Sequence, residues 1–100
     1  MTNIYEIKIS DDCLSQIKKL DEKAKEIIYS KIKLLESNPF HFKRLTGFNK
    51  PLFRIRFKSQ NIEKRLVFVV DGNLVKLICI LERKHDYNDL AKYIEKNKLF

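Results

Sequence analysis

Residues 52–58 read Leu-Phe-Arg-Ile-Arg-Phe-Lys, a strict alternation of apolar and basic side chains. Successive side chains of a β-strand point to opposite faces, so this period of two predicts a strand. The apolar side, which is expected to face a hydrophobic core, consists of Phe53, Ile55 and Phe57. The basic side, which is expected to face water or a ligand, consists of Arg54, Arg56 and Lys58.

Two further strands are predicted after this one, at residues 64–70 and 74–81. Asp71-Gly72 lies between them and is a strong signal for a tight hairpin. Residues 74–81 are apolar on both faces except at Lys76, as is typical of a central strand. Pairing of 52–58 with 64–70 would bring Arg65 near Arg54 or Arg56, although the pattern leaves the register open.

The N-terminal part predicts one strand followed by two helices. Residues 4–9 alternate, with Tyr5, Ile7 and Ile9 on the inner side, and the candidates for the cap of a first helix are Ser10, Asp11 and Asp12. Asp21 is placed to cap a second helix, which ends before Asn38-Pro39. The apolar stripe of this second helix is Ala24, Ile27, Ile28, Ile32 and Leu35. The two helices are expected to form a helical hairpin.

Residues 40–51 show no clear period, and we interpret them as an ordered loop. Its aromatic side chains, expected to anchor the loop to the core, are Phe40, Phe42 and Phe48. A closing helix is predicted from Asp86 onward.

Together these elements predict a single α+β domain over residues 1–100. Its order is an N-terminal strand, a helical hairpin, an antiparallel three-strand meander that completes a twisted sheet, and a C-terminal helix. The hairpin is expected to cover one face of the sheet and to leave the other face open for function.

Composition narrows the possible functions. The chain has 100 residues and a formal charge of +8, which indicates one core and a polyanionic partner, either a nucleic acid or an acidic protein. Charge kept only for solubility is the alternative. Only two glycines occur, so neither a Walker loop nor a GxGxxG loop can be formed, and no Cys/His cluster has zinc-finger spacing. We expect no cofactor and no metal.

The same sequence predicts a cytoplasmic protein. Its longest apolar runs, residues 66–70 and 77–81, are far shorter than the roughly 20 residues of a membrane helix. The N-terminus shows no signal-peptide pattern. The two cysteines are Cys13 and Cys79, and the second lies in an apolar run, where a reduced and buried thiol is the usual state.

A dense polar run, Glu82-Arg83-Lys84-His85-Asp86-Tyr87, follows the last predicted strand. A meander would bring Arg65 close to it. Ribonucleolytic cleavage without a metal needs a base for the ribose 2′-hydroxyl, fixed cations for the phosphorane-like transition state, and an acid for the 5′-oxygen. Arginine forks suit phosphate oxygens, His85 has a suitable unperturbed pKa, and Tyr87 offers a ring to stack on a base.

Each of these residues also has a purely structural interpretation. The three basic side chains of 52–58 can be the solvated face of an edge strand. Arg65 and Arg83 can form surface ion pairs with Glu63 and Glu82. His85 and Tyr87 can be structural, as can His41 between its aromatic neighbours. Composition alone supports only a basic nucleic-acid-binding domain.

From Tyr5 to about Lys96 the chain resembles the RelE/ParE toxin superfamily of type II toxin–antitoxin systems, most closely its RelE-like branch. Beyond the early strand and helical hairpin, the segments that carry the resemblance are residues 35–39 (LESNP), 43–47 (KRLTG), 52–56 (LFRIR), 64–68 (KRLVF) and 83–87 (RKHDY). The resemblance implies a two-layer fold with a twisted antiparallel sheet, a cognate antitoxin in a hetero-oligomer, no membrane, and metal-free mRNA cleavage at the A site of the 70S ribosome. The products carry a 2′,3′-cyclic phosphate and a 5′-hydroxyl.

The resemblance also implies roles for particular residues. The catalytic set is Arg65 at the scissile phosphate, Arg83 as acid or phosphate clamp, His85 as acid or base, and Tyr87 on the cleaved nucleotide. The resemblance also assigns Arg56 to a basic position of the second strand. With the basic residues of the strand pattern and of the polar run, the predicted RNA-binding set is Arg54, Arg56, Lys58, Lys64 and Lys84. The general base is left open among Lys50, Lys58, Lys64 and His85.

The chain also departs from the family pattern. Residues 57–63 lack the glycine that many relatives have, which predicts a longer hairpin and leaves the Arg56–Arg65 register in doubt. Two rival functions share the fold: a ParE-like, non-enzymatic poison of DNA gyrase, and an inactive relative that binds only antitoxin or RNA.

Overall fold

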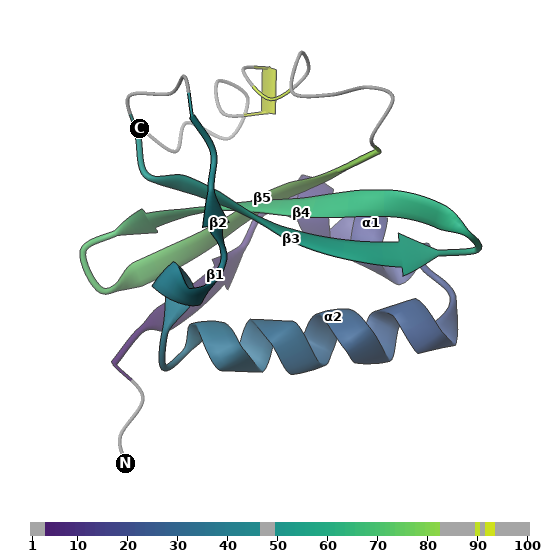
Figure 1. Cartoon of the computed structure of the whole chain (residues 1–100), viewed down its shortest axis with the longest axis horizontal. Coiled ribbons are helices and arrows are strands. Elements are labelled where there is room, and N and C mark those ends of the chain that lie inside the picture. The colour runs from purple at the N-terminus through teal and green to yellow at the C-terminus, as the bar shows by residue number, and fades with distance from the viewer. Residues whose placement is uncertain (1–3, 47–49, 83–89, 91, 94–100) are drawn as a thin grey trace.

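The computed structural model describes residues 4–46, 50–82, 90, 92 and 93. The elements, in chain order, are β1 (Glu6–Ile9), α1 (Asp11–Lys18), α2 (Glu22–Leu35), a short 3-10 turn (Pro39–His41), β2 (Lys43–Arg44), β3 (Leu52–Ser59), β4 (Ile62–Asp71) and β5 (Leu74–Glu82). The strands form one sheet in the order β1-β5-β4-β3-β2, and both helices lie on the same side of it (Figure 1). The predicted α+β class is confirmed, and so is the order of an N-terminal strand, two helices and a three-strand meander. β1 runs parallel to β5, whereas the other neighbours are antiparallel.

The predicted cap of the second helix at Asp21 is confirmed, and Ser10 is the one of the three candidates that caps the first helix. The Ser10 hydroxyl accepts a hydrogen bond from the backbone N–H of Cys13 at 3.0 Å, and Asp21 accepts one from that of Ala24 at 3.4 Å. These bonds satisfy donors that the first turn of a helix leaves without a partner. Asp21 also accepts a hydrogen bond from the Ser59 hydroxyl at 2.6 Å, which ties α2 to the end of β3. This bond lowers the pKa of Asp21 below its usual 3.8.

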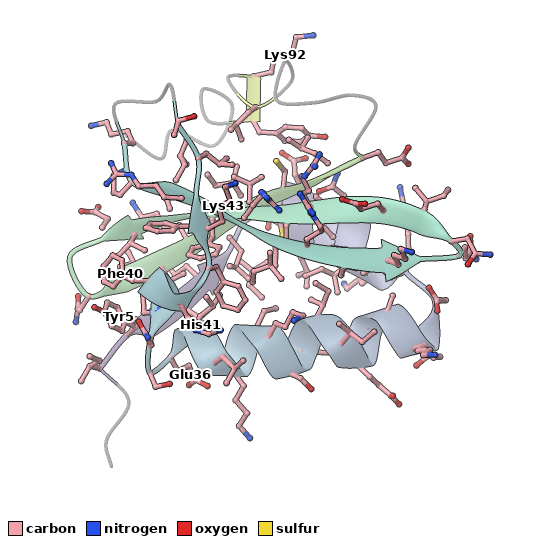
Figure 2. The ribbon with its side chains drawn as sticks, in the orientation of Figure 1. Tyr5, Glu36, Phe40, His41, Lys43 and Lys92 are labelled. Atoms are coloured by element: carbon pink, nitrogen blue, oxygen red, sulfur yellow. The ribbon has the colours of Figure 1, made fainter. Side chains whose placement is uncertain are left out.

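The main core lies between the helices and the sheet. Along β3 the inward residues are Phe53, Ile55 and Phe57, as predicted, and β4 adds Leu66 and Phe68. Phe53 and Phe68 are register partners with stacked rings, 5.4 Å apart. At the C-terminal end of α2, Figure 2 shows Phe40 beside Tyr5, and their rings make an edge contact.

The β3–β4 hairpin is tighter than the sequence indicated. β3 continues to Ser59 and β4 begins at Ile62, so Gln60 and Asn61 alone make the turn. Both have positive φ, 51° and 65°, as a type I′ turn requires, and asparagine tolerates this conformation better than most residues. The predicted longer hairpin is therefore wrong. The uninterrupted register places Arg56 directly opposite Arg65.

The segment after α2 contains a strand that the sequence did not reveal. Lys43 and Arg44 form β2 and pair with Arg54 and Phe53 of β3. Two residues are too few to show the alternation that identifies a strand, so the sequence alone predicts a loop at this position. Of the predicted loop anchors, Phe42 packs on the core, Phe40 is 54% exposed, and Phe48 lies outside the described residues.

The β4–β5 hairpin turns at Gly72, whose φ of +61° favours glycine. Farther along, the register shifts between Val67 and Phe68, which marks a β-bulge in β5 at Ile78. The Ser10 hydroxyl donates to the carbonyl oxygen of Ile78 at 2.6 Å and so holds this irregular point.

Gln16 of α1 closes the edge of β5 where β1 has ended. Its side-chain Nε2 donates to the carbonyl oxygen of Ile80 at 2.9 Å, and its Oε1 accepts from the Ile80 N–H at 2.7 Å. The amide therefore replaces a strand partner, and it satisfies backbone groups that would otherwise lie at a sheet edge.

The face of the sheet opposite the helices is only partly open. A second, smaller cluster of buried residues covers part of it: Leu45, Leu52, Val67, Val69, Ile78, Cys79, Leu81 and Leu90. Leu90, which is helical, is fully buried there, so the described part of the predicted C-terminal helix packs on this face. The expectation of an open face is therefore wrong for its apolar half. Those side chains would form a large exposed apolar patch if nothing packed on them.

Neither Cys13 nor Cys79 forms a disulfide, and both are buried, as predicted for the second of them. Burial raises the pKa of the Cys13 thiol to about 12, which leaves it unreactive at neutral pH. Within the described ranges, no helix has the length and apolar character needed to cross a bilayer.

Candidate functional site

The sheet alternation gathers basic side chains on the face away from the helices. Five residues make up this surface, which we call the basic face: Lys43 of β2, Arg54, Arg56 and Lys58 of β3, and Arg65 of β4. The strand registers order them, since Lys43 pairs with Arg54, and Arg56 pairs with Arg65. Of the predicted site residues, the structure therefore brings four together on one face.

A single carboxylate lies among these cations. Glu63 is two residues before Arg65 on β4, so both side chains point to the same face. Its Oε1 lies 3.0 Å from Arg56 Nε and 3.7 Å from Arg65 Nη2. The Glu63 side chain is 23% exposed, Arg65 only 11% and Arg56 51%. Glu63 therefore holds the two arginines in one cluster, in a partly desolvated position where their charges are less screened.

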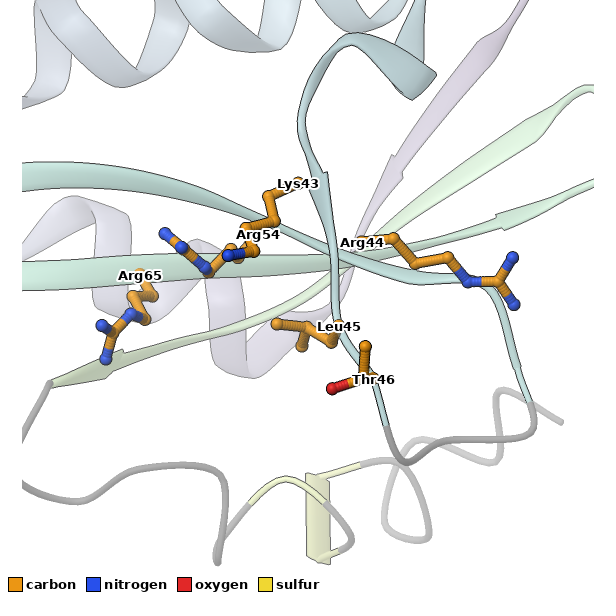
Figure 3. A pocket seen from close by; sticks show the side chains of 6 residues that line it. All are labelled: Lys43, Arg44, Leu45, Thr46, Arg54 and Arg65. Carbon is orange, nitrogen blue, oxygen red and sulfur yellow. The ribbon is translucent and has the colours of Figure 1, made fainter.

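Next to this cluster is a pocket of about 380 Å³. Its lining consists of Lys43, Arg44, Leu45, Thr46, Arg54 and Arg65. In Figure 3, Lys43, Arg54 and Arg65 extend to one side of the pocket, whereas Arg44 extends away from them. Four of the six lining residues are basic and none is acidic, so the pocket suits an anion.

The other predicted site residues have different outcomes. Lys64 is two residues before Leu66 on β4, so its side chain points to the same, helix-bearing side of the sheet. There its Nζ lies 4.0 Å from Glu82 Oε1. The structure does not bring it to the basic face. Arg83, Lys84, His85 and Tyr87 lie outside the described residues. Their assignments stay predictions from the sequence.

Sequence reasoning missed five contributors to this region. Four of them line the pocket from β2, which was too short to recognise, and from the two residues after it: Lys43, Arg44, Leu45 and Thr46. Glu63 was considered as a surface partner of Arg65, and that pair exists, but its contact with Arg56 depends on the two-residue turn. The signal that could have found it is the spacing of Glu63 and Arg65, two residues apart in one strand.

The chemistry of the basic face follows from its groups. Arginine forks donate to phosphate oxygens and stay protonated, so Arg56 and Arg65 can stabilise negative charge on phosphorus. Glu63 is an acceptor only. Among the described residues, no group of three or more His, Cys, Asp or Glu is arranged to hold a metal ion.

Comparison with solved structures gives several close matches of the whole fold. A double arginine variant of the E. coli toxin RelE, in the free state, aligns over 100% of both chains with a TM-score of 0.71 and 20% identity. The intact E. coli RelBE toxin–antitoxin complex aligns over 77% of this chain and 94% of that chain, with a TM-score of 0.63 and 24% identity. An archaeal RelE–RelB complex from Pyrococcus horikoshii aligns over 80% and 96%, with a TM-score of 0.61 and 18% identity.

No protein-family model matches the chain, and no curated protein is significantly similar to it in sequence. At these low identities the structural matches establish the architecture, which agrees with the resemblance seen in the sequence. The chain has the fold of the RelE toxins.

Proposed function

We propose that this protein is the toxin of a type II toxin–antitoxin system and that it cleaves messenger RNA as a metal-independent endoribonuclease. The observation that carries the proposal is the direct pairing of Arg56 with Arg65 on the basic face, beside a pocket with four basic lining residues. The RelE fold supports the same function, because the similar structures are named as RelE toxins and RelE–RelB complexes.

In the proposed reaction the RNA backbone lies along the basic face. The ribose 2′-oxygen attacks the adjacent phosphorus, and Arg65 with Arg56 stabilises the charge that develops on the phosphoryl oxygens. Removal of one such donor typically costs about 10²–10³ in rate. Arg83 or His85 is proposed to protonate the leaving 5′-oxygen, and Tyr87 to stack on the cleaved nucleotide, as the sequence predicts.

The proposal includes two partners. A cognate antitoxin would bind the toxin in a hetero-oligomer, as RelB accompanies RelE in the similar complexes. The 70S ribosome in the cytoplasm would present the messenger in its A site. The charge of +8 fits both RNA and an acidic antitoxin segment.

The test is primer extension on a translated messenger, incubated with the purified protein and 70S ribosomes. A parallel reaction uses naked RNA in EDTA, since ribosomes need Mg²⁺ and the naked-RNA arm tests metal independence. Arg65→Ala is expected to abolish new cuts. Lys25→Ala is the matched control, because it removes one charge from α2, on the other side of the sheet.

Cuts within codons that disappear in Arg65→Ala and persist in Lys25→Ala would support the proposal. Intact RNA in both arms would overturn it, and a supercoiling assay would then test gyrase inhibition. Tight, salt-dependent RNA binding without cleavage would identify an inactive relative instead.

A further inference from the structure

In the cluster of Arg56, Glu63 and Arg65, the two arginines have a role in the proposed reaction and the Glu63 carboxylate has none. Glu63 Oε1 lies 3.0 Å from Arg56 and 3.7 Å from Arg65, and its side chain is 23% exposed. A phosphate bound by the two arginines would therefore have a carboxylate beside it. An isolated surface ion pair joins one cation to one carboxylate, whereas the Glu63 carboxylate contacts two guanidinium groups.

We propose that Glu63 is the general base of the cleavage reaction. This inference rests on the proposed ribonuclease function and assigns a catalytic residue that neither the sequence patterns nor the fold identified. The general base must lie within hydrogen-bond reach of the 2′-hydroxyl, which is next to the scissile phosphate. A 2′-hydroxyl next to a phosphate bound by Arg56 and Arg65 would lie beside Glu63, because the same two guanidinium groups contact its carboxylate.

The protonation states favour Glu63 over the lysines predicted from the sequence. A carboxylate accepts a proton at neutral pH as it stands, whereas a lysine must first lose one. Arg56 and Arg65 cannot serve, since guanidinium groups stay protonated in proteins. Lys58 shares the face but is exposed, whereas the Glu63 side chain is only 23% exposed and contacts both arginines. Lys64 belongs to the other side of the sheet.

A Glu63 oxygen takes the proton of the 2′-hydroxyl while the O2′–P bond forms. The P–O5′ bond breaks, and the departing 5′-oxygen receives a proton from the general acid of residues 83–87. The products are a 2′,3′-cyclic phosphate and a 5′-hydroxyl; the Glu63 carboxyl then gives its proton to water, and the general acid takes one back from water. No oxidant, reductant or metal takes part in this balance.

The position of Glu63 also predicts how binding and catalysis separate. Its removal frees Arg56 and Arg65 from an ion pair, so RNA binding should stay the same or tighten. The chemical step should slow by about 10²–10⁴, the usual contribution of general acid–base catalysis. A carboxylate that only positions Arg56 and Arg65 would also slow the chemical step when removed, and recovery of the rate by added formate separates that role from the role of a base.

The experiment measures single-turnover cleavage of the RNA that the unaltered protein cuts in primer extension, either the messenger on 70S ribosomes or naked RNA. The enzymes, each in excess over the RNA, are the unaltered protein, Glu63→Gln and Glu63→Asp. RNA affinity and thermal unfolding are measured on the same samples. Glu22→Gln is the matched control, because it removes one carboxylate from the exposed first turn of α2. Glu63→Gln should lose about 10²–10⁴ in rate at unchanged or tighter binding, and Glu63→Asp should retain part of the rate.

Glu63→Ala with added formate provides a second readout, since a small carboxylate can take the vacant place of the base. Recovery of rate by formate in this variant, and not in the unaltered protein, would support the assignment. A Glu63→Gln rate close to that of the unaltered protein, or faster, would overturn it and identify the carboxylate as structural or as a competitor of phosphate. Absence of cleavage by the unaltered protein would overturn the proposed function itself, together with this inference.

Discussion

The two faces of the central sheet are made by the same strands but carry different properties. On the helix-bearing face, β3 and β4 contribute aromatic and aliphatic side chains such as Phe53, Leu66 and Phe68. On the other face they contribute the arginines and Glu63 beside a smaller apolar cluster. Along β3, buried and charged side chains alternate residue by residue, so neighbouring substitutions there should separate folding from function.

The largest expected effect is on the helix-bearing face. Phe68→Ala removes a fully buried ring that stacks on Phe53 and meets Phe42 edge-on. The resulting cavity should lower the free energy of unfolding by about 3–5 kcal/mol. Urea unfolding followed by circular dichroism measures it. A decrease in the free energy of unfolding of less than about 0.5 kcal/mol, the usual size for an exposed residue, would show that Phe68 is not central to the core.

Gln16 links the helical layer to the strand edge, and its replacement should have the next largest effect. Gln16→Leu leaves the N–H and carbonyl of Ile80 without their side-chain partner, and such a loss costs about 1–3 kcal/mol. Ser15→Ala, one residue away and exposed, is the control. Equal unfolding midpoints for the two variants would contradict the role of Gln16 as a substitute strand partner.

Much of the helix-bearing layer was predictable from sequence because it depends on local patterns. The caps at Ser10 and Asp21 and the alternation of 52–58 identify their elements without knowledge of the fold. The basic face was predictable only in part. Its residues follow from alternation, but the Arg56–Arg65 register depends on a turn at Gln60 and Asn61 that lacks glycine.

Other features depend on contacts between distant segments, which a single sequence does not encode locally. The parallel pairing of β1 with β5 and the two-residue β2 are of this kind. So is the burial of Leu45 and Leu90 on the second face, which closes a surface expected to be open. Periodicity states which side of a strand is apolar, but it does not state what will cover that side.

A smaller, pH-dependent effect should appear where the two layers meet at Asp21 and Ser59. The folded protein lowers the pKa of Asp21 below 3.8, first through the Ser59 hydrogen bond, so the ionised form is stabilised. This stabilisation is present above the unfolded pKa and is lost as pH falls through the folded pKa. Ser59→Ala should therefore destabilise the protein at pH 7 and much less in strong acid. Urea midpoints at both pH values measure this, and an equal difference at both would contradict it.

The smallest expected effect is on the basic face and concerns RNA affinity. Lys43→Ala should reduce the salt dependence of RNA binding by about 0.7 in the log–log slope, the value for one phosphate contact with a single strand. Lys64→Ala is the variant to compare with Lys43→Ala. The sequence predicts that Lys64 binds RNA, whereas the structure places it on the helix-bearing side. A larger slope change in Lys64→Ala than in Lys43→Ala would contradict the assignment of the two faces.

The most direct test of the separation between the faces is a paired measurement on Arg65→Lys. This change keeps the charge but removes the bidentate fork that suits a phosphate. RNA cleavage by primer extension and the free energy of unfolding are measured on one preparation. We expect cleavage to fall by about 10²–10³ while stability stays within about 1 kcal/mol of the unaltered protein. Unchanged cleavage, or a loss of stability large enough to explain the lost activity, would contradict a catalytic role for this face.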